Sequence, residues 1–378
     1  MFDADLISQA VAWRHDFHRY PELGFEETRT SETVARLLSS WGWHVHRGMA
    51  KTGVVARLGE GTGLGLRADM DALPIVEVND FAHKSTIAGK MHACGHDGHT
   101  AMLLLAAQRI AELDLGTRSV TLIFQPSEEN DGGALAMIEE GLFEKFPCEA
   151  IYAIHNWPSL PVGQFAARDD SIMAAFGIFD IVLRGTGGHA AMPELSDGVL
   201  AAAGRLIPML QEIPARRLSP LEPGVVSVTQ IQGGAAYNVC PDEVHLAGCA
   251  RWFGAAAGDT LQSSLRAITE RLAAAHGCTA EISYDRSYPA TINTPEHAAT
   301  ARRVAAGMGL EVSNPRPSMA SEDFSAMLEV QPGAYLWLGA AREGGKNPRL
   351  HAADYDFNDA VLAKGAEFWV RLVEDSLR

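Results

Sequence analysis

The chain has 378 residues, of which 47% are hydrophobic and 21% charged, and this balance excludes disordered and collagen-like chains. Acidic residues outnumber basic ones by 47 to 31, so the net charge of -16 argues against a nucleic-acid partner. No apolar run suggests a transmembrane helix, no secretory signal opens the chain, and the five cysteines form no CxxC motif. We therefore expect a cytoplasmic protein with reduced thiols and no membrane partner.

The first part of the chain alternates predicted helices and strands, which indicates an α/β sheet with parallel members. The expected elements are a helix over 4–18, a helix ending at Gly42, strands over 54–58 and 64–68, a helix over 98–113, a strand over 119–125, a helix over 133–143 and a strand over 150–155. The Gly-rich segment 59–63 has no Lys-Ser/Thr or helix after it. It therefore predicts a hairpin turn between its flanking strands rather than a phosphate loop.

The order of predicted strands and helices changes near residue 177. Strands over 179–185, 225–231, 243–253 and 280–286 and helices over 196–212 and 258–276 follow one another in the order β-α-β-β-α-β. This order predicts a ferredoxin-like α+β domain. Helices over 295–308, 322–329 and 358–376 and a strand over 334–339 then resume the first pattern. We expect one α/β domain with a mixed sheet made of 1–176 and 290–378, with a smaller domain, 177–289, inserted in it.

Four short motifs carry the chemistry. The segment HACGHDGHT (92–100) places a thiol, Cys94, and an imidazole, His96, within reach of one metal ion. QPSEE (125–129) ends a buried strand with two adjacent carboxylates, of which one can bind a metal while the other acts as a general base. His155 ends another apolar strand, and His351 precedes an acidic, aromatic turn. Taken alone, HACGHDGHT favours metal binding over a capped helix start, whereas an acidic helix start and structural histidines are the commoner explanations of the other three motifs.

Their joint placement favours metal binding, because ligands of open α/β sheets sit at the carboxyl ends of the strands. Five residues, Cys94, His96, Glu129, His155 and His351, then supply two metal ions with three ligands each, provided that one residue bridges. The charge of two divalent ions exceeds that of a thiolate, a carboxylate and a hydroxide. The remaining positive charge favours an anionic substrate and stabilises a developing oxyanion.

The sequence resembles the hippurate hydrolase and auxin-conjugate hydrolase branch of the two-domain metallo-aminoacylase/carboxypeptidase superfamily. The matching motifs cover nearly the whole chain in order: HDFHRYPELGFEE (15–27), LRADMDALPI (66–75), HACGHDGHT, QPSEE, HNWP, RGTGGHAAMP (184–193), YNVCPDEV (237–244), SEDFS (321–325) and LHAADYDFND (350–359). The resemblance implies that the five ligands hold two metals, with Cys94 in place of the family's bridging carboxylate. It implies Glu128 as the general base and the inserted domain as a lid through which two chains form a homodimer.

The resemblance implies further roles outside the ligand set. His189 matches a histidine that polarises the scissile carbonyl, commonly in the site of the partner subunit. Asn238 and Arg251 match residues that bind the substrate, and an arginine suits a carboxylate. Asp69 and Asp71 match positions that orient a metal ligand. Cys240 and the HAAD sequence after Leu350 depart from the family pattern, and His351 itself is retained.

The expected activity is metal-dependent hydrolysis of the amide bond of N-acyl amino acids to a carboxylic acid and a free amino acid. The small-molecule substrate is an N-acyl amino acid, and the cofactors are two divalent ions, zinc or manganese first, with cobalt and nickel also compatible. Peptide hydrolysis, as a dipeptidase or carboxypeptidase, is the alternative within the superfamily. A metal-independent thiol hydrolase, with Cys94 as nucleophile and His96 or His92 as base, and a non-catalytic binding protein both leave ligands of the set unexplained.

Overall fold

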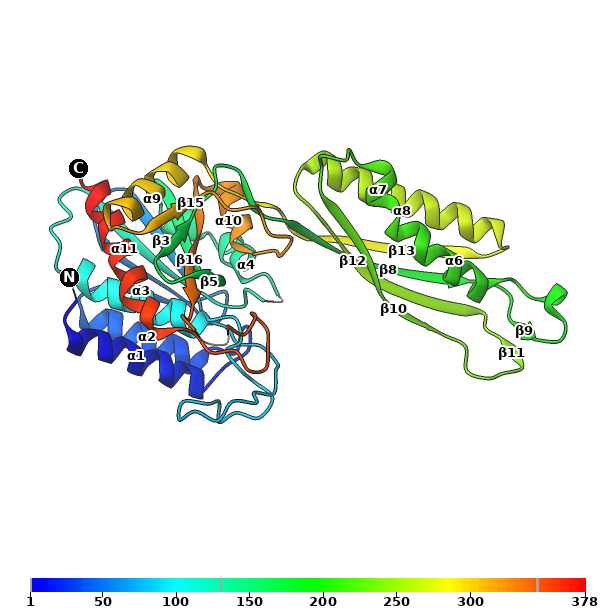
Figure 1. Cartoon of the computed structure of the whole chain (residues 1–378), viewed down its shortest axis with the longest axis horizontal. Helices are drawn as coiled ribbons and strands as arrows, with labels where there is room; N and C mark the ends of the chain where they lie inside the picture. Colours follow the sequence, from blue (N-terminus) through cyan, green and yellow to red (C-terminus); the bar gives the residue numbers. More distant parts are fainter. Residues whose placement is uncertain (1, 130, 345–346) are drawn as a thin grey trace. The chain divides into compact units, whose positions relative to one another are not determined.

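The computed structural model describes residues 2–129, 131–344 and 347–378. The chain divides into two compact units (Figure 1). Unit 1 comprises Met1–Ile172, Thr291–Arg316 and Glu322–Arg378, and unit 2 comprises Met173–Ala290 and Pro317–Ser321. Among the described residues, no helix combines the length and the apolar character that a bilayer span requires.

Unit 1 is built on an eight-stranded mixed sheet with the order β1-β2-β4-β3-β5-β16-β6-β15. Its strands are β1 (His44–Met49), β2 (Gly53–Gly59), β3 (Gly63–Asp69), β4 (Ser119–Gln125), β5 (Ala150–Pro161), β6 (Gln164–Ala166), β15 (Glu311–Ser313) and β16 (Gly333–Ala341). The strands β4, β3, β5 and β16 run parallel to one another, while β1, β2 and β6 pair antiparallel with a neighbour. The expected α/β class with a mixed sheet is therefore confirmed.

The hairpin predicted around residues 59–63 is wrong. Both flanking strands form, but β4 lies between them and pairs antiparallel with β2 and parallel with β3. The glycines of this segment instead allow the backbone of residues 59–63 to lie close to the backbone that leads into β4. A Cβ at Gly63 would overlap the carbonyl oxygen of Ser119, the first residue of β4.

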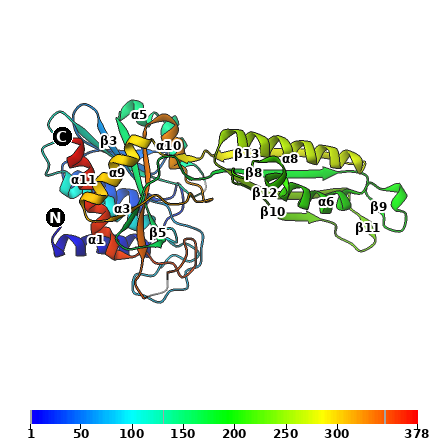
Figure 2. The same cartoon turned by 45° about the horizontal axis from the view of Figure 1, so that its top comes forward.

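Helices cover both faces of this sheet (Figures 1 and 2). They are α1 (Ala4–Arg19), α2 (Thr28–Ser40), α3 (His96–Ile110), α4 (Gly133–Glu139), α5 (Leu142–Lys145), α9 (Pro295–Gly307), α10 (Phe324–Val330) and α11 (Leu362–Ser376), the last preceded by a 3-10 turn, η2 (Asp359–Val361). The single helix expected over 133–143 is two short helices, because Gly141 between them adopts a φ of 83°. The other expected helices are present, with ends shifted by a few residues.

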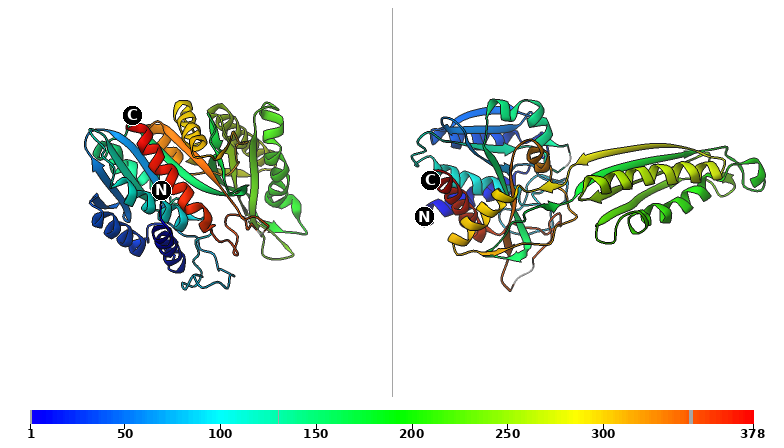
Figure 3. Two further views of the ribbon diagram at one scale, coloured as in Figure 1. Left: turned by 60° about the vertical axis from the view of Figure 1, so that its left-hand side comes forward. Right: turned by 90° about the horizontal axis from the view of Figure 1, so that it is seen from above.

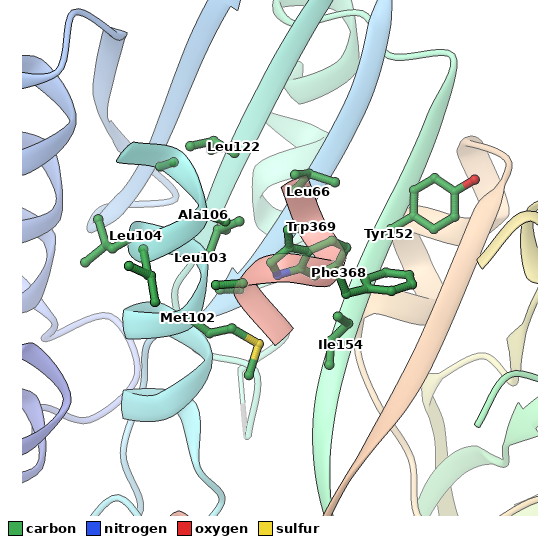
Figure 4. Packing of buried hydrophobic residues seen from close by; sticks show 14 of the residues in the cluster. Leu66, Met102, Leu103, Leu104, Ala106, Leu122, Tyr152, Ile154, Phe368 and Trp369 are labelled. Carbon is green, nitrogen blue, oxygen red and sulfur yellow. The ribbon is translucent and has the colours of Figure 1, made fainter. Parts of the chain in front are cut away.

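The core of unit 1 lies where α3 and α11 meet the central strands (Figure 4). Met102 and Leu103 of α3 face Trp369 of α11, and Leu66 of β3 and Ile154 of β5 complete the packing. All five side chains are almost fully buried. Burial of a side chain of this size contributes about 1.5–3 kcal/mol, so this contact fixes α3, and with it the residues at the start of α3, against the sheet.

Unit 2 contains a four-stranded, fully antiparallel sheet with the order β10-β12-β8-β13. Its elements are β8 (Ala175–Arg184), α6 (Val199–Gln211), α7 (Ile213–Arg217), β10 (Gly224–Gly233), β12 (Glu243–Trp252), α8 (Ala255–Ala275) and β13 (Thr279–Tyr288). The helices α6 and α8 lie side by side on one face of the sheet (Figure 3). The smaller pieces of unit 2 are β9 (Gly188–His189), η1 (Pro193–Leu195) and β11 (Val239–Cys240), while β14 (Thr291–Ile292) of unit 1 pairs with β7 (Ser171–Met173) at the unit boundary. Inward-facing residues such as Phe179, Leu246 and Leu265 form a separate hydrophobic core.

Candidate functional site

Cys94 and His96 lie at the point where the chain enters α3. Gly95 between them has a φ of 99°, and a Cβ there would overlap the side-chain oxygen of Asn156. Only glycine combines this backbone conformation with so close an approach. The Cys-Gly-His sequence therefore turns both side chains toward the same buried space, and their exposed fractions are 7% and 0%.

The other predicted ligands come from three separate segments and reach the same space. The Sγ of Cys94 lies 3.4 Å from Nε2 of His155, which is on β5. Nε2 of His351 lies 3.1 Å from Oε1 of Glu129, and Nε2 of His96 lies 3.9 Å from that same oxygen. The structure thus brings all five side chains together at one end of the central strands.

Donor atoms in this cluster fall into overlapping groups of the size that holds a metal ion. Cys94, His96 and His155 form one group, and Cys94, Glu129 and His351 form another, with the donor atoms of each group within 4.8 Å of one another. Cys94 belongs to both groups. A thiolate common to two sets of imidazole and carboxylate donors is the arrangement that a bridging ligand requires.

Two buried donor atoms support a bound cation here. Within the described residues, Nε2 of His96 has no hydrogen-bond partner, and Oε1 of Glu129 accepts no hydrogen bond although Nε2 of His351 lies 3.1 Å away. Leaving such an atom unpaired away from water costs about 1–3 kcal/mol. A metal ion bound by both atoms removes this cost, so the residues present fit divalent cations.

Asp71 orients two of these ligands at once. Its backbone oxygen and Oδ1 lie 2.9 and 3.2 Å from Nδ1 of His96, and its Oδ2 accepts a hydrogen bond of 3.0 Å from the backbone N–H of Glu129. A proton on Nδ1 leaves Nε2 of His96 free to bind a metal. These contacts outweigh burial and hold the pKa of the Asp71 carboxyl below its usual range.

Asp69 lies closest to a neighbouring imidazole, and its Oδ2 is also 3.8 Å from Nε2 of the predicted ligand His96. Its Oδ1 lies 2.6 Å from Nδ1 of His99, whose Nε2 accepts a 3.0 Å hydrogen bond from the backbone N–H of Asn156. Although burial opposes it, the positive charge of His96, Arg67 and His99 holds the pKa of Asp69 well below its usual range. His99 was not among the predicted site residues, although it belongs to the HACGHDGHT motif.

Glu128 is buried beside the ligand cluster and faces other carboxylates. Its Oε1 accepts a 3.3 Å hydrogen bond from the backbone N–H of Asp323, and the donor atoms of Glu128, Glu322 and Asp323 lie within 4.8 Å of one another. Burial, followed by the negative charge of Glu322, Glu129 and Asp323, raises the pKa of Glu128 well above its usual range. A carboxyl group in such surroundings takes up a proton readily.

Two of the site's segments carry backbone strain. Ser127, which precedes Glu128, has a φ of 50°, and His351 has a φ of 65°. Hydrogen bonds hold both positions: the backbone N–H of Ser127 donates to Glu27 at 2.9 Å, and that of His351 donates to the carbonyl of Ala93 at 2.8 Å. Non-glycine residues in this conformation cost about 1–3 kcal/mol each, and such strain concentrates at functional sites.

The predicted carbonyl-polarising residue, His189, and the two predicted substrate-binding residues, Asn238 and Arg251, belong to unit 2. His189 on β9 pairs with Val239 on β11, and the carbonyl of Asn238 accepts a 3.0 Å hydrogen bond from the backbone N–H of Ala190. His189 and Asn238 line one open depression together with the glycines 187–188 and residues 239–242. Arg251 is not part of it: on β12, its guanidinium donates to the carbonyl of Met319 and the hydroxyl of Ser321, both at 3.1 Å.

The cluster defines a class of protein: a set of thiol, imidazole and carboxylate donors, buried except for the half-exposed His351, beside a carboxyl group of raised pKa marks a metal-dependent hydrolase. Residues 65–375 match peptidase family M20/M25/M40. The chain therefore belongs to this family and is a metal-dependent amide hydrolase, which confirms the resemblance drawn from the sequence motifs.

Individual relatives match along the whole chain. Hippurate hydrolase of Campylobacter jejuni is 37% identical over 374 residues, covering 97% of this chain and 96% of the relative. IAA-amino acid hydrolase ILR1-like 2 of Arabidopsis thaliana is 39% identical over 372 residues, covering 96% of this chain and 84% of the relative. The crystal structure of the Bacillus subtilis YXEP protein, described as a dinuclear metal-binding peptidase of the M20 family, aligns with a TM-score of 0.87 and 30% identity over 100% of this chain and 99% of that one.

Proposed function

We propose that this enzyme hydrolyses the amide bond of N-acyl amino acids and releases a carboxylic acid and a free amino acid. The observation that carries the proposal is the pair of donor groups that share Cys94, with the buried carboxyl of Glu128 beside them. The hippurate and IAA-amino acid hydrolases, each more than a third identical to this chain, act on conjugates of this chemical class.

The metal cofactors are two divalent ions, held by Cys94, His96, Glu129, His155 and His351. When bound, such ions polarise a carbonyl oxygen and lower the pKa of a coordinated water toward neutrality. A thiolate with three imidazoles suits zinc, and manganese, cobalt and nickel are compatible with the remaining donors.

The chain's own residues move the protons. Glu128 takes a proton from the water that adds to the acyl carbon, and it returns that proton to the amide nitrogen as the C–N bond breaks. Its burial among carboxylates matches this double role, because a carboxyl of raised pKa serves first as base and then as acid. His189 stabilises the oxyanion, and Asn238 and Arg251 hold the substrate carboxylate.

Unit 2 is the lid and dimerisation domain in this proposal. Its β-α-β-β-α-β order and its antiparallel strand order support a ferredoxin-like fold. The discontinuous domains, 1–176 with 290–378 and 177–289, correspond to catalytic and lid parts, and two chains associate through the lid. His189 then reaches the catalytic centre of the partner subunit.

One substrate panel tests the activity and its rivals. The purified enzyme is assayed with N-benzoyl, N-acetyl and indole-acetyl amino acids and with dipeptides, each with chelator and after addition of zinc or manganese. We expect hydrolysis of the acyl conjugates that chelation abolishes and metal restores. Faster turnover of dipeptides favours the dipeptidase or carboxypeptidase alternative, and activity that survives chelation favours a thiol hydrolase.

Replacement of Glu128 by Gln tests the proton transfer. The amide keeps the shape of the side chain but neither takes nor gives a proton, so kcat is expected to fall about 10²–10⁴-fold. Elemental analysis is expected to find the metal content of the wild type. Near-normal turnover in this variant would remove Glu128 from the mechanism.

A further inference from the structure

Arg67 is a buried cation that sits among acidic groups of three segments. It lies on β3, where the neighbouring positions of the strand are buried and apolar or glycine, and its side chain is 2% exposed. Its Nη1 donates to Asp69 at 2.5 Å, and its Nη2 donates to Glu322 at 2.8 Å and to Asp323 at 3.2 Å. Its Nε donates to Gln125 at 2.8 Å.

Asp323 connects this cation to Glu128. The side-chain amide of Gln125 donates to both oxygens of Asp323 at 2.8 Å, and the backbone N–H of Ala134 donates to Oδ2 at 2.9 Å. With the side chain held on these sides, the backbone N–H of Asp323 points at Oε1 of Glu128, at 3.3 Å. The guanidinium of Arg67 also interacts electrostatically with Glu128 itself.

We propose that Arg67 and Asp323 are positioning residues that hold the carboxyl group of Glu128 at the angle at which it receives and returns its proton. This inference rests on the proposed function, because it assigns Glu128 the role of the base. Neither residue touches the substrate in this proposal; both act through Glu128.

The planar guanidinium of Arg67 can donate hydrogen bonds in several fixed directions at once, and the hydrogen-bond network around Glu128 depends on this geometry. Three nitrogens of one planar group fix the ends of β3 and β4 and the start of α10 relative to one another. A buried ion network is a poor source of stability, because desolvation offsets the attraction. Its contribution is instead a fixed geometry, which a proton-transferring group needs.

Arg67→Lys is the first variant, because it keeps the charge and removes the planar guanidinium. We expect kcat to fall at least about tenfold, with KM within about twofold and metal content unchanged, since binding does not depend on Glu128. The matched control is Arg57→Lys on β2, where the arginine is partly exposed and bonds to the carbonyl of Pro147. Its kcat is expected to equal that of the wild type.

A double-mutant cycle separates positioning from general structural damage. If Arg67 acts through Glu128, the Arg67→Lys change lowers the residual turnover of the Glu128→Gln variant by less than about twofold. Equal fold-losses in the two backgrounds would overturn the proposal, as would an unchanged kcat in the single variant.

Asp323→Asn repeats the cycle if Arg67→Lys does not fold, because asparagine retains one acceptor for Arg67 and the backbone N–H toward Glu128. A kcat loss that disappears in the Glu128→Gln background is again the expected result, and an additive loss contradicts the proposal. The proposed function fails separately: a wild type and a Glu128→Gln variant of equal turnover would refute the base assignment before any Arg67 variant is measured.

Discussion

At the scale of single residues, the orientation of the proposed metal ligands depends on the hydrogen bonds that hold their rings. Nδ1 of His155 lies 2.7 Å from the carbonyl of Asn156, so a proton there leaves Nε2 directed at Cys94. His96 is held in the same way by Asp71. In both cases a hydrogen bond on one ring nitrogen orients the other as a metal donor. The cluster is therefore preorganised by backbone and carboxylate oxygens.

Cys94→Ala tests the shared thiolate. Because Cys94 belongs to both donor groups, its removal is expected to lower the affinity for both ions about 10–100-fold or more, and elemental analysis after dialysis should show substoichiometric metal. Cys148→Ala, at another buried free thiol that belongs to no donor group among the described residues, is the control and should retain full metal content. Full occupancy in Cys94→Ala would exclude Cys94 as a ligand.

His18 makes stability depend on pH. Its ring lies 2.9 Å from Asp97 and 3.2 Å from Glu77, and although burial opposes it, these hydrogen bonds raise its pKa to about 9. Since the folded-state pKa is above the ordinary value, the stabilisation is complete below about pH 6.5 and is lost as pH rises through about 9.

Denaturant unfolding of wild type and His18→Gln at several pH values measures this effect. The stability advantage of the wild type is expected to shrink by about 3 kcal/mol between pH 6 and pH 10. A difference that stays constant over this pH range would show that the charge of His18 does not stabilise the fold.

Sequence motifs pointed to residues that carry distinctive side chains at distinctive spacings, and they did not point to the proposed positioning residues, whose partners are distant in the sequence. Cys94, His96 and the acidic pair after β4 stand out locally. Arg67 reaches Glu322 and Asp323, which are 255 and 256 positions away along the chain, and no periodicity connects them. Two features of the sequence could have indicated this network: the arginine Arg67 within an otherwise apolar strand, and the acidic pair Glu322 and Asp323 before a helix. Each feature is more often explained without a buried ion network.

At the scale of elements, most strands and helices were predicted because their apolar periods are strong. What the sequence did not predict was the pairing of strands. The turn 59–63 has the composition of a hairpin, yet β4 inserts between β2 and β3, because non-local burial of a fully buried strand outweighs a local turn preference. Short edge strands such as β15 were missed because three residues carry no period.

Two helical glycines provide a matched test of helix packing. A Cβ at Gly365 in α11 would overlap the sulfur of Met102 in α3, so Gly365→Ala is expected to destabilise the protein by about 1–3 kcal/mol. Gly204 in α6 is exposed with no atom near a new Cβ, and Gly204→Ala should stabilise by about 0.5–1 kcal/mol. Chemical denaturation measures both, and equal effects would contradict the close α3–α11 contact.

At the scale of the whole molecule, the proposed sharing of His189 between two subunits predicts complementation. In a hybrid dimer of His189→Ala and Glu128→Gln chains, one site has both an intact Glu128 and the partner's His189. Co-expression of two inactive variants is therefore expected to restore about a quarter of wild-type turnover per chain, since half of random dimers are hybrids. Mixtures that stay inactive would argue against sharing.

The order of the strands in the sheet of unit 1 affects how the chain folds during synthesis. The strand β16 lies between β5 and β6, yet all of unit 2 except residues 317–321 is synthesised between β6 and the return of the chain to unit 1. Until β16 emerges, β5 presents an unpaired inner edge, which is an aggregation hazard in a growing chain. His351 follows β16, so the donor group of Cys94, Glu129 and His351 is complete only after β16 has been synthesised. The donor group of Cys94, His96 and His155, in contrast, is synthesised before unit 2.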